Sequence, residues 1–163
     1  MPTISTALAT FVDPAEGMRS DAVSGSGFGV SFDTRSTAEG GAGPSPTETV
    51  LAALAACTAI DVASIMRKKR QQIDEYQIAV TAEKADEHPR VFTSIVVEHR
   101  ITGNVSVEAV RRSVELSATA YCPVSAMLSH SVRIEHRYRL QSIAGQETDA
   151  ESAVVVVTGP TAG

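Results

Sequence analysis

The sequence predicts an α+β domain, because strand-like and helix-like segments follow one another without the regular alternation of a parallel α/β sheet. The expected order is two strands, a long helix, a hairpin, a second helix and a last strand. A chain of 163 residues fits one ordinary domain. The hydrophobic fraction is 43%, but 42 of these 70 residues are alanine or valine, so small side chains must fill the core.

Two apolar segments near the start, residues 4–12 and 27–33, predict strands joined as a meander. Phe28, Val30 and Phe32 alternate, which predicts that one face of the second strand is buried. The next segment, Thr37–Pro46, is rich in Gly and Pro, and its composition predicts a flexible loop.

A long helix is expected to begin at Ser45. Ser45 can cap it, Pro46 suits the first helical position, and Glu48 completes a capping box. Apolar and small residues then recur at three- and four-residue steps, which predicts a helix of about 25 residues. Its alanine-rich middle, residues 52–63, must be packed closely on several sides, so we expect a central helix.

The second half of the chain is expected to begin with a long hairpin. Alternating residues predict strands around residues 76–82 and 91–99, with a turn at His88–Arg90. A second helix begins at Ser106 and should break at residues 121–123, because proline cannot continue the helical hydrogen bonds.

The rest of the chain is expected to hold a short helix and a strand. The helix can restart from Pro123 through Leu128, and residues 132–140 alternate as a final strand. We therefore expect one domain over residues 1–140. The tail, residues 141–163, is polar except for Val154–Val157, and is expected to be a loose end or an extra edge strand.

Charge and hydropathy exclude some partners. The net charge is −5, the wrong sign for holding phosphate backbones, so nucleic acid is not an expected partner. No run of about 18 apolar residues and no targeting segment is evident, so no membrane partner is expected. We expect a cytoplasmic protein.

The two cysteines, Cys57 and Cys122, fit neither the usual zinc spacings nor a thioredoxin motif. They are either two buried thiols or a reactive pair that cycles, becoming a sulfenic acid and then a disulfide if the two helices pack side by side. Asp61, one helical turn after Cys57, would raise the pKa of that thiol. The four histidines and the cysteines show no cluster at ligand spacing, so no metal site is expected.

Two segments carry a family resemblance. The run Gly43–Glu48 with Leu51–Val62 places a cysteine at the end of a small-residue stretch of the central helix, and Leu116–Val124 contains a Tyr-Cys-Pro motif. Together these segments resemble the signature of the OsmC/Ohr family. The resemblance implies an intertwined homodimer with two central helices packed against antiparallel sheets.

The resemblance also implies an activity, the thiol-dependent reduction of organic hydroperoxides in oxidative stress defence. Cys57 would be the peroxidatic nucleophile and Cys122 the resolving cysteine. The resulting Cys57–Cys122 disulfide would be reduced by a small dithiol or a lipoylated protein. No cofactor is implied, whether metal, flavin or haem.

Two further site residues follow from the resemblance, an early arginine and a glutamate that keep the nucleophile ionised. Arg35 is the expected arginine, with Arg19 as the alternative. The family glutamate lies ten positions before the cysteine, at Thr47 here, whereas Glu48 lies nine before Cys57 and faces the opposite side of the helix. Glu48 could serve a partner's site or cap its own helix.

Two other functions stay open. The same dimer could bind a small apolar molecule or lipid without catalysis, since Asp61 and the displaced glutamate disfavour an activated thiol. Alternatively, the protein could be a redox sensor whose Cys57–Cys122 bond alters a partner surface.

Overall fold

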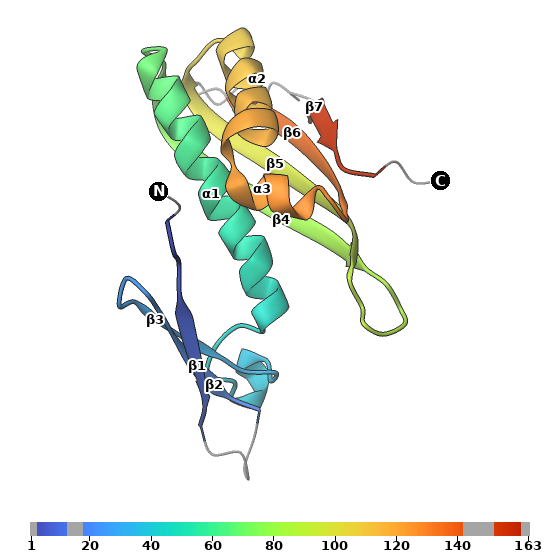
Figure 1. Ribbon diagram of the computed structural model, residues 1–163. Helices are drawn as coiled ribbons and strands as arrows, with labels where there is room; N and C mark the ends of the chain where they lie inside the picture. Colours follow the sequence, from blue (N-terminus) through green and yellow to red (C-terminus); the bar gives the residue numbers. More distant parts are fainter. Residues whose placement is uncertain (1–2, 13–17, 142–151, 161–163) are drawn as a thin grey trace. The chain divides into compact units, whose positions relative to one another are not determined.

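The computed structural model describes residues 3–12, 18–141 and 152–160 (Figure 1). The chain forms two compact units, Met1–Val50 and Leu51–Gly163. Strands and helices are mixed without regular alternation, so the α+β class is confirmed.

The first unit contains a three-stranded antiparallel sheet in the order β1-β2-β3. Its strands are β1 (Ala7–Phe11), β2 (Ser20–Ser24) and β3 (Gly29–Phe32). The sequence analysis missed β2, because its residues SDAVS carry no apolar alternation. The expected burial of the β3 face is wrong within this unit. Phe28 is 79% exposed and Val30 41% exposed, since no described element of the unit covers them.

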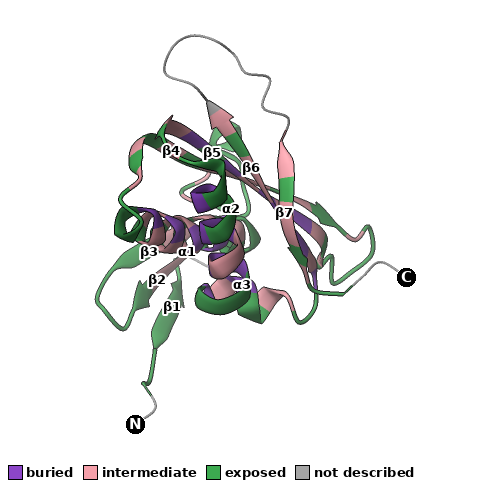
Figure 2. Cartoon of the chain, turned by 90° about the horizontal axis from the view of Figure 1, so that it is seen from above, coloured by how far each residue is buried: buried purple, intermediate pink, exposed green. Residues whose placement is uncertain are grey.

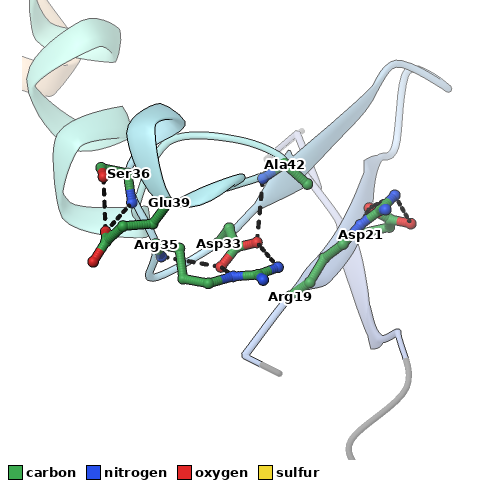
Figure 3. A network of polar contacts seen from close by, with 7 residues as sticks. All are labelled: Arg19, Asp21, Asp33, Arg35, Ser36, Glu39 and Ala42. Atoms are coloured by element: carbon green, nitrogen blue, oxygen red, sulfur yellow. Dashed lines mark hydrogen bonds and ion pairs between the residues drawn. The ribbon is translucent and has the colours of Figure 1, made fainter. Parts of the chain in front are cut away.

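The loop after β3 contains local hydrogen bonds and a short helical turn. The buried Asp33 carboxylate accepts hydrogen bonds from the backbone N–H groups of Arg35 and Ala42, at 3.0 and 3.2 Å, and from the Arg35 guanidinium (Figure 3). A short 3-10 helix, η1 (Thr37–Glu39), lies between them. Gly43 has no room for a side chain, because a Cβ there would lie 1.9 Å from a carbonyl oxygen of β3.

Helix α1 (Pro46–Lys68) begins at the expected residue and has 23 residues. The Ser45 backbone N–H and hydroxyl donate to the Glu48 carboxylate at 2.8 and 2.7 Å, and the Glu48 N–H donates back to Ser45 Oγ at 3.3 Å. These are the two halves of a capping box, so the predicted helix start is confirmed.

Removing this cap should cost a measurable amount of stability. Ser45→Ala is expected to lower the free energy of unfolding by about 1 kcal/mol, because it leaves an N-terminal backbone N–H without an acceptor. Urea denaturation measures the change. Ser64→Ala, an exposed position in the last third of α1, is the control and should be neutral or slightly stabilising. A loss as large in the control would contradict the role of the cap.

Only one stripe of α1 is buried in the described chain, at positions four residues apart: Leu54, Thr58, Val62 and Met66. Ile60, on another face, is 70% exposed. The alanine-rich middle is therefore not packed on several sides by this chain alone.

Helix α1 is long and apolar enough to cross a membrane by length and composition. The expectation that no segment could span a membrane is therefore wrong by these two criteria. Core helices share such a composition.

The second unit contains a four-stranded sheet in the order β4-β5-β6-β7. The predicted hairpin is confirmed as β4 (Gln72–Lys84) and β5 (Phe92–Asn104). The next strand, β6 (Arg133–Gln141), runs parallel to β5, so the expectation of antiparallel sheets is corrected for this one pair. The reason is the helical crossover between β5 and β6. It returns the chain to the end of the sheet where β5 begins, so both strands run in the same direction.

In the tail, residues 153–158 form β7 (Ala153–Thr158), which pairs antiparallel with β6. Part of the tail is thus an edge strand of the sheet. Tail residues 142–151 and 161–163 lie outside the described residues.

Within the second unit, the helices cover one face of the sheet (Figure 1). They are the part of α1 that belongs to this unit, α2 (Val107–Leu116) and α3 (Pro123–Leu128). Buried residues gather where the helices face the strands (Figure 2). One apolar cluster includes Leu54, Ile95 and Cys122, and a second includes Val62, Met66 and Val110. The core therefore holds one of the two thiols.

Candidate active site

Three chemically active side chains meet in the second unit. Cys57 and Asp61 are one turn apart on α1 and therefore share a face of the helix. Cys122 lies at the start of α3. The two sulfur atoms and a carboxylate oxygen of Asp61 all lie within 4.8 Å of one another. The structure thus brings together the two thiols that are 65 positions apart in the sequence.

A break in the helical backbone positions Cys122. Helix α2 continues into a π-helical turn, η2 (Ser117–Tyr121), and Cys122 then adopts an extended conformation with φ −72° and ψ 106°. Pro123 follows as the first residue of α3, where its missing N–H costs nothing. The helix break and restart expected at residues 121–123 are confirmed, and π-helical turns of this kind occur frequently at functional sites.

Three hydrogen-bond donors hold these acidic groups. The Ser125 backbone N–H donates to Cys122 Sγ at 3.3 Å, and the Thr58 hydroxyl donates to the same sulfur at 3.6 Å. The Ser117 hydroxyl donates to the Asp61 carboxylate at 3.2 Å. All three donor residues are fully buried. The sequence analysis did not identify their roles, because the donors lie on three different elements, α1, η2 and α3, and meet the thiols and Asp61 only in the packed structure.

The electrostatic environment favours the neutral form of Cys57. Burial raises the pKa of this thiol most, and the neighbouring Cys122 thiol and the Asp61 carboxylate raise it further. The Val124 backbone N–H, which donates a hydrogen bond to Cys57, lowers the pKa. The expected effect of Asp61 is confirmed in direction, although burial is the larger cause. No basic side chain is among these influences, so thiolate formation needs a positive charge from elsewhere.

Removing the Asp61 charge should make Cys57 more reactive. Asp61→Asn is expected to move the pH dependence of Cys57 alkylation by iodoacetamide to lower pH, because the pKa of the thiol falls when a neighbouring anion is lost. Peptide mass spectrometry measures the alkylation of Cys57 separately from that of Cys122. Asp74→Asn, at an exposed position on β4, is the control and should leave the profile unchanged. A shift of the Asp61→Asn profile to higher pH would contradict this electrostatic account.

The other three candidate residues lie in the first unit and have local partners there. The Arg35 guanidinium pairs with Asp33 at 3.0 Å, and that of Arg19 pairs with Asp21 at 3.2 Å (Figure 3). Glu48 belongs to the capping box described above. Each of the three therefore has a structural role in its own unit, and their assignment to the thiol site stays a prediction.

A second group of buried polar residues lies in the same core. The Tyr76 hydroxyl is 2.7 Å from His99 Nδ1, and the His99 and His136 rings are 5.9 Å apart. Burial raises the pKa of Tyr76, with the Asp61 charge as a second cause. Burial lowers the pKa of His99 to about 3 and that of His136 to about 4. Both imidazoles are therefore neutral at ordinary pH.

Comparison with known proteins gives a consistent result. Residues 38–137 match the family described as OsmC-like protein. Protein YhfA of Escherichia coli strain K12 is 40% identical over 126 residues, which are 77% of this chain and 92% of that protein.

Two solved structures show the same fold. An OsmC-like protein from Mycoplasma pneumoniae matches with a TM-score of 0.74 and 18% identity, over 86% of this chain and 99% of that chain. An organic hydroperoxide resistance protein from Elizabethkingia anophelis matches with a TM-score of 0.63 and 15% identity, over 86% and 99% of the two chains.

Proposed function

Because this chain belongs to the OsmC-like protein family, we propose that it is a thiol peroxidase that reduces organic hydroperoxides. The OsmC/Ohr family includes peroxidases. The observation that carries the proposal is the pair of free thiols, Cys57 and Cys122, with sulfur atoms within 4.8 Å of each other. Two thiols at this distance can form a disulfide after small side-chain movements.

The exposure of the two thiols supports a division of roles. Cys57 is partly exposed, whereas Cys122 is only 2% exposed and has two hydrogen-bond donors on its sulfur. A hydroperoxide can therefore approach Cys57 more readily. This difference supports the proposal that Cys57 is the nucleophile and Cys122 the resolving thiol.

The proposed reaction has three steps. The Cys57 thiolate attacks the terminal peroxide oxygen, the O–O bond breaks, and the alkoxide leaves as an alcohol after taking a proton. The resulting Cys57 sulfenic acid condenses with the Cys122 thiol, which forms the S–S bond and releases water. A dithiol, either small or lipoylated on a carrier protein, then reduces this disulfide by exchange and becomes a disulfide itself. These conditions fit the expected cytoplasmic location, where thiols are kept reduced.

A positive charge is still required to form the Cys57 thiolate. Arg35, or Arg19 as the alternative, is the proposed source, and Glu48 is its proposed partner, acting in the site of a second copy. In the described structure both arginines are already paired with aspartates. Recruitment of either one would therefore require an exchange of partners.

We further propose that the protein is a homodimer. Ile60, Tyr121 and Met127 lie on the elements that carry the thiols and are 59–70% exposed. Large exposed apolar side chains on neighbouring elements are typical of an interaction surface. Light scattering is expected to give twice the chain mass of 17.1 kDa, and a monomer would contradict the dimer.

The proposal is tested by the substrate preference of the reduced protein. With dihydrolipoamide as the reductant, it should consume cumene hydroperoxide catalytically and faster than hydrogen peroxide, because the apolar surroundings of Cys57 favour an organic substrate. No consumption above the rate of the reductant alone would overturn the proposal.

The raised pKa of Cys57 favours a second candidate function, the binding of a small apolar molecule or lipid without catalysis. That function predicts a copurified small molecule in native mass spectrometry and unchanged thiols after peroxide treatment.

A further inference from the structure

The atoms of the thiol site also have the arrangement of a metal-ligand set. Cys57 Sγ, Cys122 Sγ and a carboxylate oxygen of Asp61 lie within 4.8 Å of one another. Two of these ligands are four residues apart on α1, which is the spacing that lets two side chains on one helix face reach the same ion. The third comes from the helix break at the start of α3. The sequence spacing did not reveal this set because it depends on how the helices pack.

Two sulfurs and one oxygen suit a particular class of cation. Thiolates select soft or borderline ions such as Zn²⁺ over Mg²⁺ or Ca²⁺, which prefer oxygen ligands. With Zn–S bonds of about 2.3 Å and Zn–O bonds of about 2.0–2.2 Å, tetrahedral ligands lie about 3.5–3.8 Å apart. The observed separations, at most 4.8 Å, therefore require rotamer-scale adjustment and no refolding.

The surroundings have the features of a second coordination shell. The Ser117 hydroxyl donates to the Asp61 carboxylate at 3.2 Å and so fixes its orientation. The Ser125 N–H and the Thr58 hydroxyl both donate to Cys122 Sγ. Outer partners of this kind orient metal ligands and contribute to affinity.

The charge of the site is one-sided. Two thiols and one carboxylate converge, and no ion pair with an arginine or lysine is recorded for Asp61 among residues 3–12, 18–141 and 152–160. A divalent cation would be attracted by the Asp61 carboxylate and would favour the ionised form of both thiols. The thiol protons would pass to solvent on coordination.

We propose that the reduced protein binds one Zn²⁺ ion per chain through Cys57, Asp61 and Cys122, with the fourth position open to water or another small ligand. Such three-ligand sites with an open position are typical of accessible rather than purely structural zinc. Zinc occupies both sulfur atoms, so the metal-loaded state and the disulfide state exclude each other. Metal binding therefore protects the thiol pair from oxidation.

The test is a zinc titration of the full-length protein, reduced and then freed of reductant without oxygen, in competition with a chromophoric chelator. Wild type is expected to bind one Zn²⁺ per chain and to show no measurable binding of Mg²⁺. Cys57→Ser, Cys122→Ser and Asp61→Asn should each lose more than about 100-fold in affinity, because a ligand matters at least as much as an outer partner. Binding of Co²⁺ should add a thiolate-to-cobalt charge-transfer band.

A matched pair of buried serines tests the outer shell. Ser117→Ala is expected to weaken zinc binding by about 10–100-fold. Ser113→Ala is the control, since this serine is equally buried one turn earlier on α2 but donates to the Ala109 carbonyl. It should leave zinc affinity unchanged.

Three results would overturn the proposal: no zinc binding by reduced wild type, equal affinity in wild type and Asp61→Asn, or one zinc per two chains. The readout is metal affinity, so it is independent of peroxide turnover. If the protein binds zinc but reduces no hydroperoxide, only the proposed function is contradicted. If it reduces hydroperoxides but binds no zinc, only the zinc site is contradicted.

Discussion

Replacing Cys57 with serine is expected to lower the catalytic reduction of cumene hydroperoxide by at least about 10³-fold, because the hydroxyl of serine is far less nucleophilic toward peroxide than a thiolate. Replacing Cys122 should have a different effect. Cys122→Ser is expected to consume about one equivalent of hydroperoxide per chain and then stop, since the Cys57 sulfenic acid has no partner for disulfide formation.

Stopped-flow measurement of peroxide consumption distinguishes these two results, and a sulfenic acid trap such as dimedone should label only the Cys122→Ser protein. Ser113→Ala is the control and should keep full turnover. Ser113 is fully buried, and its hydroxyl donates to the Ala109 carbonyl rather than to a thiol. Equal turnover in wild type and Cys57→Ser would contradict the assignment of Cys57 as the nucleophile.

Mild acid is expected to destabilise the fold strongly through two buried histidines. Burial lowers the pKa of His99 to about 3 and that of His136 to about 4, whereas both titrate near 6.5 when unfolded. The unfolded chain therefore binds more protons below pH 6.5. Stability is fully present above that pH and is lost as the pH falls toward the folded pKa values.

Each histidine is expected to remove up to about 1.4 kcal/mol of unfolding free energy per pH unit, and together they remove about 4.5 kcal/mol between pH 6.5 and 4.5. That is a large part of the stability of an ordinary domain, about 5–15 kcal/mol. The pH range from 6.5 to 4.5 separates the effect of the histidines on stability from that of the carboxylates. The pKa values of Glu98 and Glu135 are lowered by arginine partners, so those groups lose stability only at more acidic pH.

Urea denaturation at a series of pH values measures this slope. His136→Leu should flatten it by about half, because neither ring nitrogen of His136 has a hydrogen-bond partner among the described residues, so the replacement leaves no buried group unpaired. His130→Gln, at a less buried position, is the control and should keep the wild-type slope. An unfolding free energy that stays constant down to pH 4.5 would contradict the burial of neutral imidazoles. NMR titration of the rings gives the same test if a variant does not fold.

Local signals in the sequence were sufficient for the helices. Ser45, Pro46 and Glu48 predict the start of α1 at the residue where the structure has it, because capping depends on residues close in sequence. Pro123 likewise predicts the helix break, because it lacks an N–H wherever it lies. These features need no knowledge of the tertiary fold.

Strand pairing and side-chain partners depended on tertiary contacts and could not be predicted in the same way. The parallel pairing of β5 and β6 follows from the crossover between them, and the weak strand β2 is held by its two neighbours. Thr58 and Ser117 show their roles only when α1 packs against η2 and the start of α3. For Arg35, the catalytic role suggested by the family resemblance stays a prediction; within its own unit this residue pairs with Asp33.

The central claim is that Cys57 and Cys122 of one chain act as a redox pair, and peptide mapping after peroxide treatment tests it most directly. The reduced protein is treated with one equivalent of cumene hydroperoxide, digested without reductant and analysed by mass spectrometry. The expected product is a Cys57–Cys122 disulfide within one chain, which makes the chain lighter by two hydrogen atoms. Unmodified thiols, or disulfides formed only between chains, would contradict the claim.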